Sequence, residues 1–121
     1  MQDVLRTGCS FLGTLEPERQ STAEEAKRVA ERLIASFGSM IVYWQHFVNT
    51  GTRITFNTDP NDSIAKAFLK MLRNDGREPD PLHVKVIDAS LILYAEHDFN
   101  ASTFGCRVTA STMSDHYSAI C

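Results

Sequence analysis

One long amphipathic segment, from about Ser21 to Asn49, constrains the fold more than any other feature of this sequence. Its apolar residues recur at steps of three and four, which is the spacing of one face of an α-helix. Ser21 with Glu24 forms a capping-box pattern at its start. The sequence therefore predicts one long helix whose apolar stripe must pack against other helices. The stripe consists of Ala26, Val29, Ala30, Leu33, Ile34, Phe37, Met40, Ile41, Trp44, Phe47 and Val48.

Shorter helical segments surround the long one. Ser63, or Asp62 before it, is a candidate N-cap for a second helix that ends at Asn74-Asp75-Gly76. Asp80-Pro81 predicts the start of a third helix, which runs to about His97. The connection from Thr50 to Asn61 is expected to be irregular, with a short extended piece at Arg53–Phe56. The expected fold class is all-α.

The third helix and those at the chain ends carry further expectations. From Leu91 to Tyr94 the third helix is apolar nearly all round, so it should be buried on most sides. A further helix is expected from about Ser102, and Met1 to Leu12 should also be helical. Three residues of the helix after Ser102 are expected to point inward: Phe104, Val108 and Met113.

Composition narrows the class of protein. The chain has 121 residues, of which 43% are apolar, and a formal net charge of −3. This length and apolar content suffice for one folded domain. No apolar run approaches the ~20 residues of a membrane span, and the N-terminus lacks a signal-peptide pattern. Mild acidity without a basic block argues against nucleic acid as a partner. We therefore expect a cytoplasmic protein that binds neither membranes nor nucleic acid.

Cysteine and histidine spacing gives no sign of a metal centre. Cys9, Cys106 and Cys121 form an odd set without a CxxC pattern, so neither a disulfide framework nor a zinc site is indicated, and a reducing cytosol fits best. Glu96-His97 has no second histidine at helical spacing, so we expect no metal. Four other residues have simpler structural interpretations: Tyr43 and Trp44 as core or interface aromatics, and His46 and His83 as surface or helix-end residues. His116, beside an N-cap, is expected to be exposed.

The polar segment after the third helix is the candidate site. Glu96 to Ser102 places ionisable and amide groups directly after the most apolar helix. His97, at the helix's C-terminal end, would be favoured in its protonated form and could polarise a carbonyl oxygen or hold a carboxylate. Asn100 supplies an amide donor, and Ser102 a hydroxyl that can cap the next helix. The alternative is that His97 is a hydrogen-bonded packing residue and that Asn100 and Ser102 only cap.

The same segment carries a family resemblance. Leu91 to Phe104, together with Arg107-Val108 and Ser114 to Ile120, closely resembles the citrate synthase family. Within that family, Tyr94-Ala95-Glu96-His97 is typical of the 2-methylcitrate synthase branch. The resemblance extends to Tyr43-Trp44 with His46, to Asp62-Ser63-Ile64-Ala65 and to Asp3 through Gly8, so it covers essentially the whole chain.

The resemblance implies a fold, a reaction and residue roles. The fold would be the central part of the large helical domain, and the active unit a homo-oligomer. The reaction condenses propionyl-CoA or acetyl-CoA with oxaloacetate and needs no cofactor, since the acyl-CoA is a substrate. It needs a base for the barely acidic α-proton and donors for the enol and alkoxide. His97 falls on the residue that polarises the oxaloacetate ketone, Asn100 on a neighbouring substrate-binding position, and Ser102 on a serine that supports the enol-stabilising histidine.

The resemblance also implies what the chain lacks. Family members continue beyond the position of Cys121 into the enol-stabilising histidine and the small domain with its aspartate base. Residues 1–121 are therefore expected to form a single segment of the large domain, without the small domain. Alone the segment should be inactive, because loss of members of a catalytic set removes most of the rate enhancement. The alternative function is a helical self-association or assembly fragment without catalysis.

Overall fold

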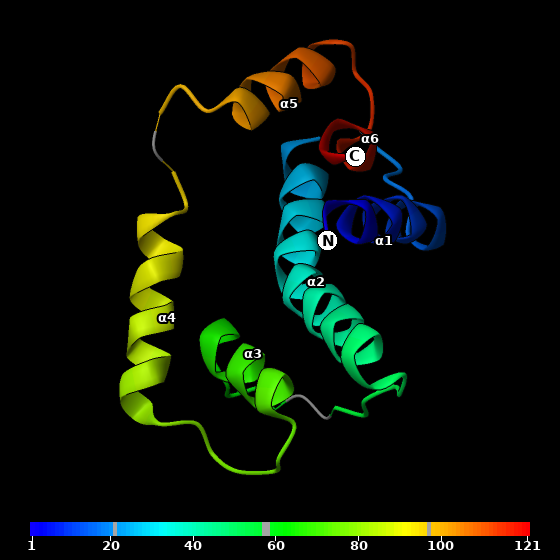
Figure 1. Ribbon diagram of the computed structural model, residues 1–121. Helices are drawn as coiled ribbons and strands as arrows, with labels where there is room; N and C mark the ends of the chain where they lie inside the picture. Colours follow the sequence, from blue (N-terminus) through cyan, green and yellow to red (C-terminus); the bar gives the residue numbers. More distant parts are fainter. Residues whose placement is uncertain (21, 57–58, 97) are drawn as a thin grey trace. The chain divides into compact units, whose positions relative to one another are not determined.

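The architecture is all-α, as the sequence predicts. The computed structural model describes residues 1–20, 22–56, 59–96 and 98–121, which form six α-helices (Figure 1). Their bounds are α1 Gln2–Leu15, α2 Ala23–Thr50, α3 Ile64–Arg73, α4 Pro81–Leu93, α5 Ala101–Ser111 and α6 His116–Ile120. No helix in these described ranges is long and apolar enough to span a bilayer.

The chain divides into two compact units. The first combines Met1–Met40 with Asp98–Cys121, and the second is Ile41–His97. The long helix α2 contributes its first part to one unit and its last part to the other. The single long helix is confirmed. Its stripe supplies Val29 and Leu33 to the core of the first unit, whereas the α2 residue in the core of the second unit, Val42, lies outside the stripe. The capping-box residue Ser21 lies outside the described residues, and Thr22 Oγ1 accepts a hydrogen bond from Glu25 N at 3.3 Å.

The core of the first unit joins three helices that are far apart in sequence. Cys9 of α1, Val29 and Leu33 of α2 and Tyr117 of α6 are all at most 3% exposed. Gly13 makes the α1–α6 approach possible, since a Cβ there would lie 3.0 Å from Tyr117 Cγ. α6 packs against both α1 and α5. A helix of five residues is marginal alone, so these tertiary contacts hold α6 in place.

Two polar contacts reinforce the first unit. Arg32 Nη1 donates to the Tyr117 hydroxyl oxygen at 2.8 Å. Glu18 Oε2 accepts from His116 N at 2.8 Å and lies 2.9 Å from His116 Nδ1. The Glu18 side chain is only 4% exposed. The expectation that His116 is exposed was therefore wrong: it is half-buried, because it packs with a carboxylate 98 positions away in sequence.

The second unit has its own small core. Val42 of α2, Ile54 of the irregular connection and Met71 of α3 are buried, with Phe56 and Phe68 packed against them. His46 Nε2 lies 3.2 Å from the Met71 carbonyl oxygen and 3.1 Å from that of Leu72. His46 is thus half-buried and ties α2 to the end of α3, which makes it a structural residue rather than a surface one.

The predicted helix caps of the second unit are confirmed. Ser63 accepts a hydrogen bond from Lys66 N at 3.2 Å and begins α3. Asn74 ends α3 in the left-handed conformation with φ 48°. Asp80 accepts from Leu82 N at 2.7 Å, with Pro81 in the first turn of α4. These local patterns set the helix bounds because each supplies a hydrogen-bond partner that a helix end otherwise lacks.

Candidate functional site

Helix α4 leads into the segment that the sequence singles out. It ends at Leu93, with Tyr94 as C-cap, four residues before the predicted end at about position 97. None of its residues is buried, and Tyr94 is 88% exposed. The expectation of a helix buried on most sides was therefore wrong for this chain. The apolar residues from Leu91 to Tyr94 have no covering element in their unit, although their composition is that of a core.

The turn between α4 and α5 contains unusual backbone. Asp98 has φ 56° and Phe99 has φ 44°, so two consecutive non-glycine residues adopt the left-handed conformation. Such residues are uncommon and are found where the surroundings hold them. The Phe99 side chain is fully exposed. This backbone turns the chain sharply into the start of α5.

Asn100 fixes the beginning of α5. Its Oδ1 accepts hydrogen bonds from Ser102 N at 2.8 Å and Thr103 N at 3.1 Å. Asn100 is therefore the N-cap, and the expectation that Ser102 caps this helix was wrong. Ser102 instead lies in the first turn and is exposed. An asparagine is a strong N-cap because its side-chain oxygen satisfies amide donors that have no partner within the helix.

His97, the predicted catalytic residue, lies outside the described residues. The structure therefore brings together two of the three predicted site residues, Asn100 and Ser102, on one helical turn. Asn100 is half-buried. The cap geometry commits the oxygen of its amide to the helix, which is the capping task that the alternative interpretation gave to Asn100 as well as to Ser102.

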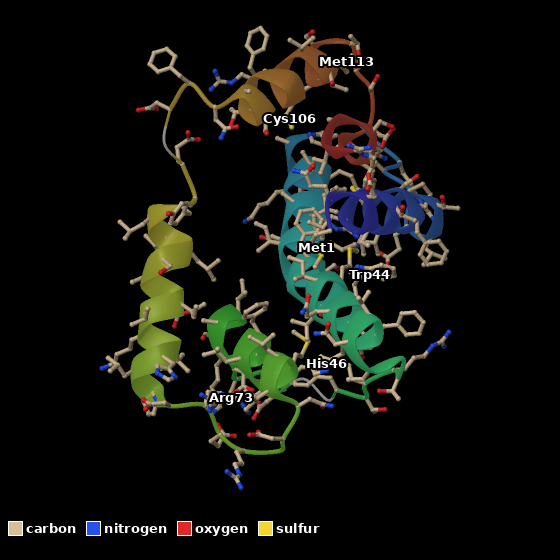
Figure 2. All side chains as sticks on the ribbon, viewed as in Figure 1. Met1, Trp44, His46, Arg73, Cys106 and Met113 are labelled. Atoms are coloured by element: carbon tan, nitrogen blue, oxygen red, sulfur yellow. The ribbon has the colours of Figure 1, made fainter. Side chains whose placement is uncertain are left out.

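The inward residues predicted for α5 are also exposed. Phe104 is 69%, Val108 50% and Met113 70% accessible to solvent. Cys106 is the residue of α5 that turns toward α6, where its Sγ lies 3.7 Å from the Ala119 carbonyl oxygen (Figure 2). The prediction was wrong because the sequence shows which side chains of α5 are apolar, but not which face of α5 meets α6.

Four charged side chains form a cluster that sequence reasoning missed. Asp62 accepts from Lys66 and Lys70, each at 2.7 Å, and both lysines reach Glu78 at 3.0 Å. Hydrogen bonds with these lysines lower the pKa of both carboxyl groups. The cluster links the start of α3 to the connection that follows it. The spacing of Asp62 with Lys66, at i and i+4, was the available signal.

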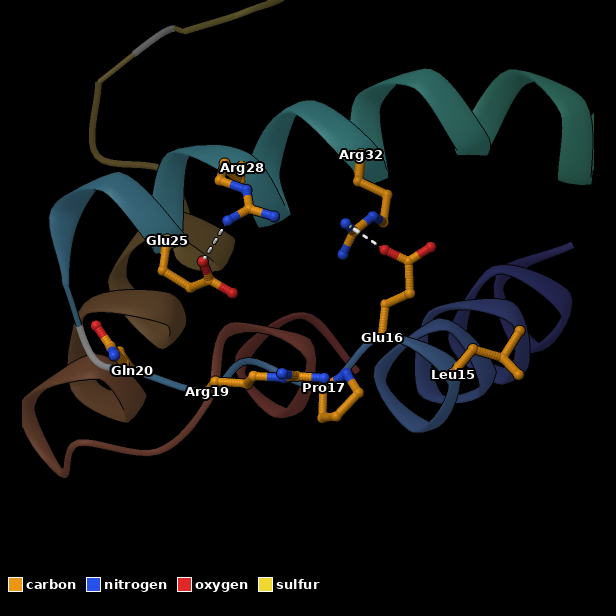
Figure 3. A pocket seen from close by; sticks show the side chains of 8 residues that line it. All are labelled: Leu15, Glu16, Pro17, Arg19, Gln20, Glu25, Arg28 and Arg32. Carbon is orange, nitrogen blue, oxygen red and sulfur yellow. Dashed lines mark hydrogen bonds and ion pairs between the residues drawn. The ribbon is translucent and has the colours of Figure 1, made fainter.

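A polar hollow lies beside the start of α2, between the end of α1 and α2 (Figure 3). Its volume is about 420 Å³. Arg28 pairs with Glu25 at 3.1 Å, and Arg32 pairs with Glu16. No residue of the α4–α5 segment lines it. Because Arg28 and Arg32 are paired with neighbouring carboxylates, this part of the hollow has the chemistry of a folded polar surface rather than of a catalytic set.

The remaining candidates have structural surroundings. Trp44 and Phe47 form a tilted aromatic pair with ring centroids 6.2 Å apart. Tyr43 and Trp44 are 39% and 40% exposed, so neither belongs to the core of its unit. His83 is exposed, with Nδ1 3.4 Å from Arg73 Nη2. Within the described ranges, no group of three or more His, Cys, Asp or Glu residues could hold a metal ion.

Comparison with known proteins shows what this chain is similar to. The model of the family described as "Citrate synthase, C-terminal domain" matches residues 1–121. A 2-methylcitrate synthase of Shewanella oneidensis is 52% identical over 118 residues, which is 98% of this chain and 30% of that protein. A citrate synthase-related protein of Dictyostelium discoideum is 46% identical, and a citrate synthase of Acidithiobacillus ferridurans is 37% identical. In each of these two, 98% of the chain aligns with about a third of the relative: 32% and 31%.

Proposed function

The chain belongs to the citrate synthase family, and from that premise we propose that its α4–α5 segment supplies oxaloacetate-binding groups to an acyltransferase. The proposed reaction condenses propionyl-CoA or acetyl-CoA with oxaloacetate. The observation that carries the proposal is the 52% identity with a 2-methylcitrate synthase across 98% of the chain. The chain spans about 30% of the length of that relative, so the whole enzyme's activity is part of the proposal.

Each predicted site residue has a proposed role. We propose that His97 donates to the ketone oxygen of oxaloacetate and so stabilises the negative charge that develops as the enol attacks. Asn100 binds the same substrate from the neighbouring position. Ser102 supports the histidine that stabilises the enol, which family members carry in a later segment. The Asn100 cap favours this arrangement, since it fixes the first turn of α5, and with it the backbone of Ser102.

The 121 residues are proposed to be inactive by themselves. They are proposed to form one segment of the large domain, and they match less than a third of the 2-methylcitrate synthase. A general base that removes the α-proton is required before condensation can occur. We therefore expect substrate binding, and not turnover, to be the property that this chain can display alone.

A second candidate function has one observation in its favour. The chain has large apolar side chains exposed along α4 and α5, among them Ile92 and Leu93, each 76% accessible. Exposed apolar side chains drive association of helical proteins when they gather into large patches. A helical assembly fragment without catalysis would show self-association and no affinity for oxaloacetate. The enzyme segment would bind oxaloacetate, whether or not it associates.

Calorimetric titration of oxaloacetate into the purified chain tests the proposal. Saturable binding is expected, and it should disappear in His97→Ala. His83→Ala is the matched control, because it removes an exposed histidine from α4 without touching the segment. If His97→Ala binds as the unchanged chain does, His97 does not hold the substrate.

Asn100→Asp separates substrate binding from helix capping. Aspartate caps a helix about as well as asparagine does, but it lacks the amide N–H donors and repels the carboxylates of oxaloacetate. We expect Asn100→Asp to keep the helix content measured by circular dichroism and to lose oxaloacetate binding. Unchanged oxaloacetate binding would assign Asn100 to capping alone.

A further inference from the structure

All three cysteines of the chain converge on α6, although they come from three different parts of the sequence. Cys9 of α1 donates through Sγ to the Tyr117 carbonyl oxygen at 3.7 Å. Cys106 of α5 donates to the Ala119 carbonyl oxygen at 3.7 Å. Cys121, directly after α6, donates to the Arg6 carbonyl oxygen of α1 at 3.5 Å. These contacts lie within the first unit.

Cys9 and Cys121 are the pair that the geometry brings together. Cys121 N donates to the Tyr117 carbonyl oxygen at 3.1 Å, and this is the same atom that Cys9 Sγ contacts. On the other side, Cys121 Sγ contacts the carbonyl oxygen of Arg6, about one helical turn before Cys9. Each cysteine therefore contacts the backbone that carries the other.

The two thiols differ in accessibility. Cys9 is 1% exposed and belongs to the core, whereas Cys121 is exposed. Burial, together with the contact with Cys121 and the negative charge of Asp115, raises the pKa of the Cys9 thiol to about 11. An oxidant in solution therefore meets Cys121 first, while Cys9 is shielded and protonated at neutral pH.

We propose that Cys9 and Cys121 form a reversible intramolecular disulfide when the protein reacts with a peroxide. This bond joins the end of α6 covalently to α1. The inference is independent of the proposed oxaloacetate site. The Cys121 sulfur attacks one oxygen of hydrogen peroxide, the O–O bond breaks, and a sulfenic acid and water result. The Cys9 sulfur then attacks the sulfenic sulfur, the S–O bond breaks, and the departing hydroxide takes the Cys9 proton as a second water. The two thiols lose two electrons, and the peroxide gains them.

The third cysteine provides a matched control. Cys106 of α5 is half-buried. It contacts α6 at the Ala119 carbonyl oxygen, and not at the carbonyl oxygen that Cys9 and Cys121 share. Cys106→Ser should therefore leave disulfide formation intact. Cys121→Ser should abolish it, and because Cys121 is exposed, this variant keeps the core that Cys9 completes.

The test is peptide mapping of the dilute chain after hydrogen peroxide treatment and blocking of the remaining thiols. We expect a peptide pair joined through Cys9 and Cys121, a mass lower by two hydrogen atoms, and reversal by dithiothreitol. The joined form should unfold at a temperature higher by on the order of 10 °C, because the bond closes a long loop. Cys106→Ser should behave in the same way. Cys121 oxidised beyond sulfenic acid while Cys9 stays a free thiol, or a disulfide through Cys106, would overturn the proposal.

Discussion

Helices α4 and α6 differ in the interactions that stabilise them. α4 has 13 residues, an aspartate N-cap followed by proline and a largely apolar composition, yet it buries none of its side chains. α6 has five residues and buries Tyr117 at 3% exposure against α1 and α2. Its local sequence stabilises α4, whereas tertiary contacts stabilise α6. Whether a segment forms a helix and whether that helix is buried are therefore set by different features of the sequence.

The exposure of α4 indicates what its apolar residues are suited to. The exposed side chains from Leu91 to Tyr94 do not lower the free energy of the folded chain through burial, because they remain in water. Val84 and Ile87, earlier in the same helix, are half-buried, and α4 packs against α3. The composition from Leu91 to Tyr94 is instead suited to packing in a larger structure. This agrees with a chain that matches about a third of its relatives' length.

Removing one tyrosine from each region tests the contrast most strongly. Tyr117→Ala should lower the free energy of unfolding by about 3–5 kcal/mol, as expected for loss of a large buried side chain. Tyr94→Ala should change it by less than about 0.5 kcal/mol, because that ring is exposed. Urea denaturation of both variants measures the difference. Equal losses in the two would show that α4 is covered in solution.

Two glycines within helices test how closely each helix is packed. Gly13→Ala should destabilise the chain by about 1–3 kcal/mol, since the new methyl would crowd Tyr117. Gly105→Ala has open space around it in α5, so it should stabilise the chain by about 0.5–1 kcal/mol through helix propensity. Thermal unfolding should therefore move in opposite directions. A shift of the same sign in both would contradict the close α1–α6 approach.

The Asn100 cap predicts a local effect at the candidate site. Asn100→Ala should cost about 1 kcal/mol, because Ser102 N and Thr103 N lose their acceptor. Ser102→Ala should cost less than about 0.5 kcal/mol. Amide hydrogen exchange in the first turn of α5 reports the effect directly. Faster exchange in Ser102→Ala than in Asn100→Ala would reverse the cap assignment.

The charge cluster of the second unit predicts a smaller, pH-dependent effect. The pKa values of Asp62 and Glu78 are lowered by hydrogen bonds to Lys66 and Lys70, so their contribution to stability is complete above their ordinary values. It should be lost as the pH falls below these ordinary values and through the lowered ones. Unfolding curves recorded between about pH 6 and pH 3 measure this loss. Asp62→Asn should flatten the dependence, and an unaltered slope would show that the cluster contributes nothing.

The sequence predicted helices better than contacts. Ser63, Asp80 and Asn74 set helix bounds correctly, because caps act on neighbouring amides. The inward positions of Phe104 and Val108 were wrong, since the pattern identifies an apolar face but not whether another element covers it. Val42, fully buried, lay outside the predicted stripe for the same reason.

The candidate site was predictable in part. Its location after an apolar helix, and Asn100 with Ser102 within it, came from the sequence and the family resemblance. The sequence offered capping for both Asn100 and Ser102 and could not choose between them, because either residue type caps a helix and only the backbone geometry distinguishes them. The contact between His116 and Glu18 joins residues 98 positions apart in sequence, and no local pattern predicts such a pair.

Segment replacement in a complete relative tests the central proposal most directly. This chain would replace the matching segment of the Shewanella oneidensis 2-methylcitrate synthase, and condensation of propionyl-CoA and acetyl-CoA with oxaloacetate would be measured. The account predicts an active chimera in which His97→Ala lowers kcat/KM for oxaloacetate about 100-fold or more, while His83→Ala has little effect. A folded, active chimera in which His97→Ala matches His83→Ala would contradict it.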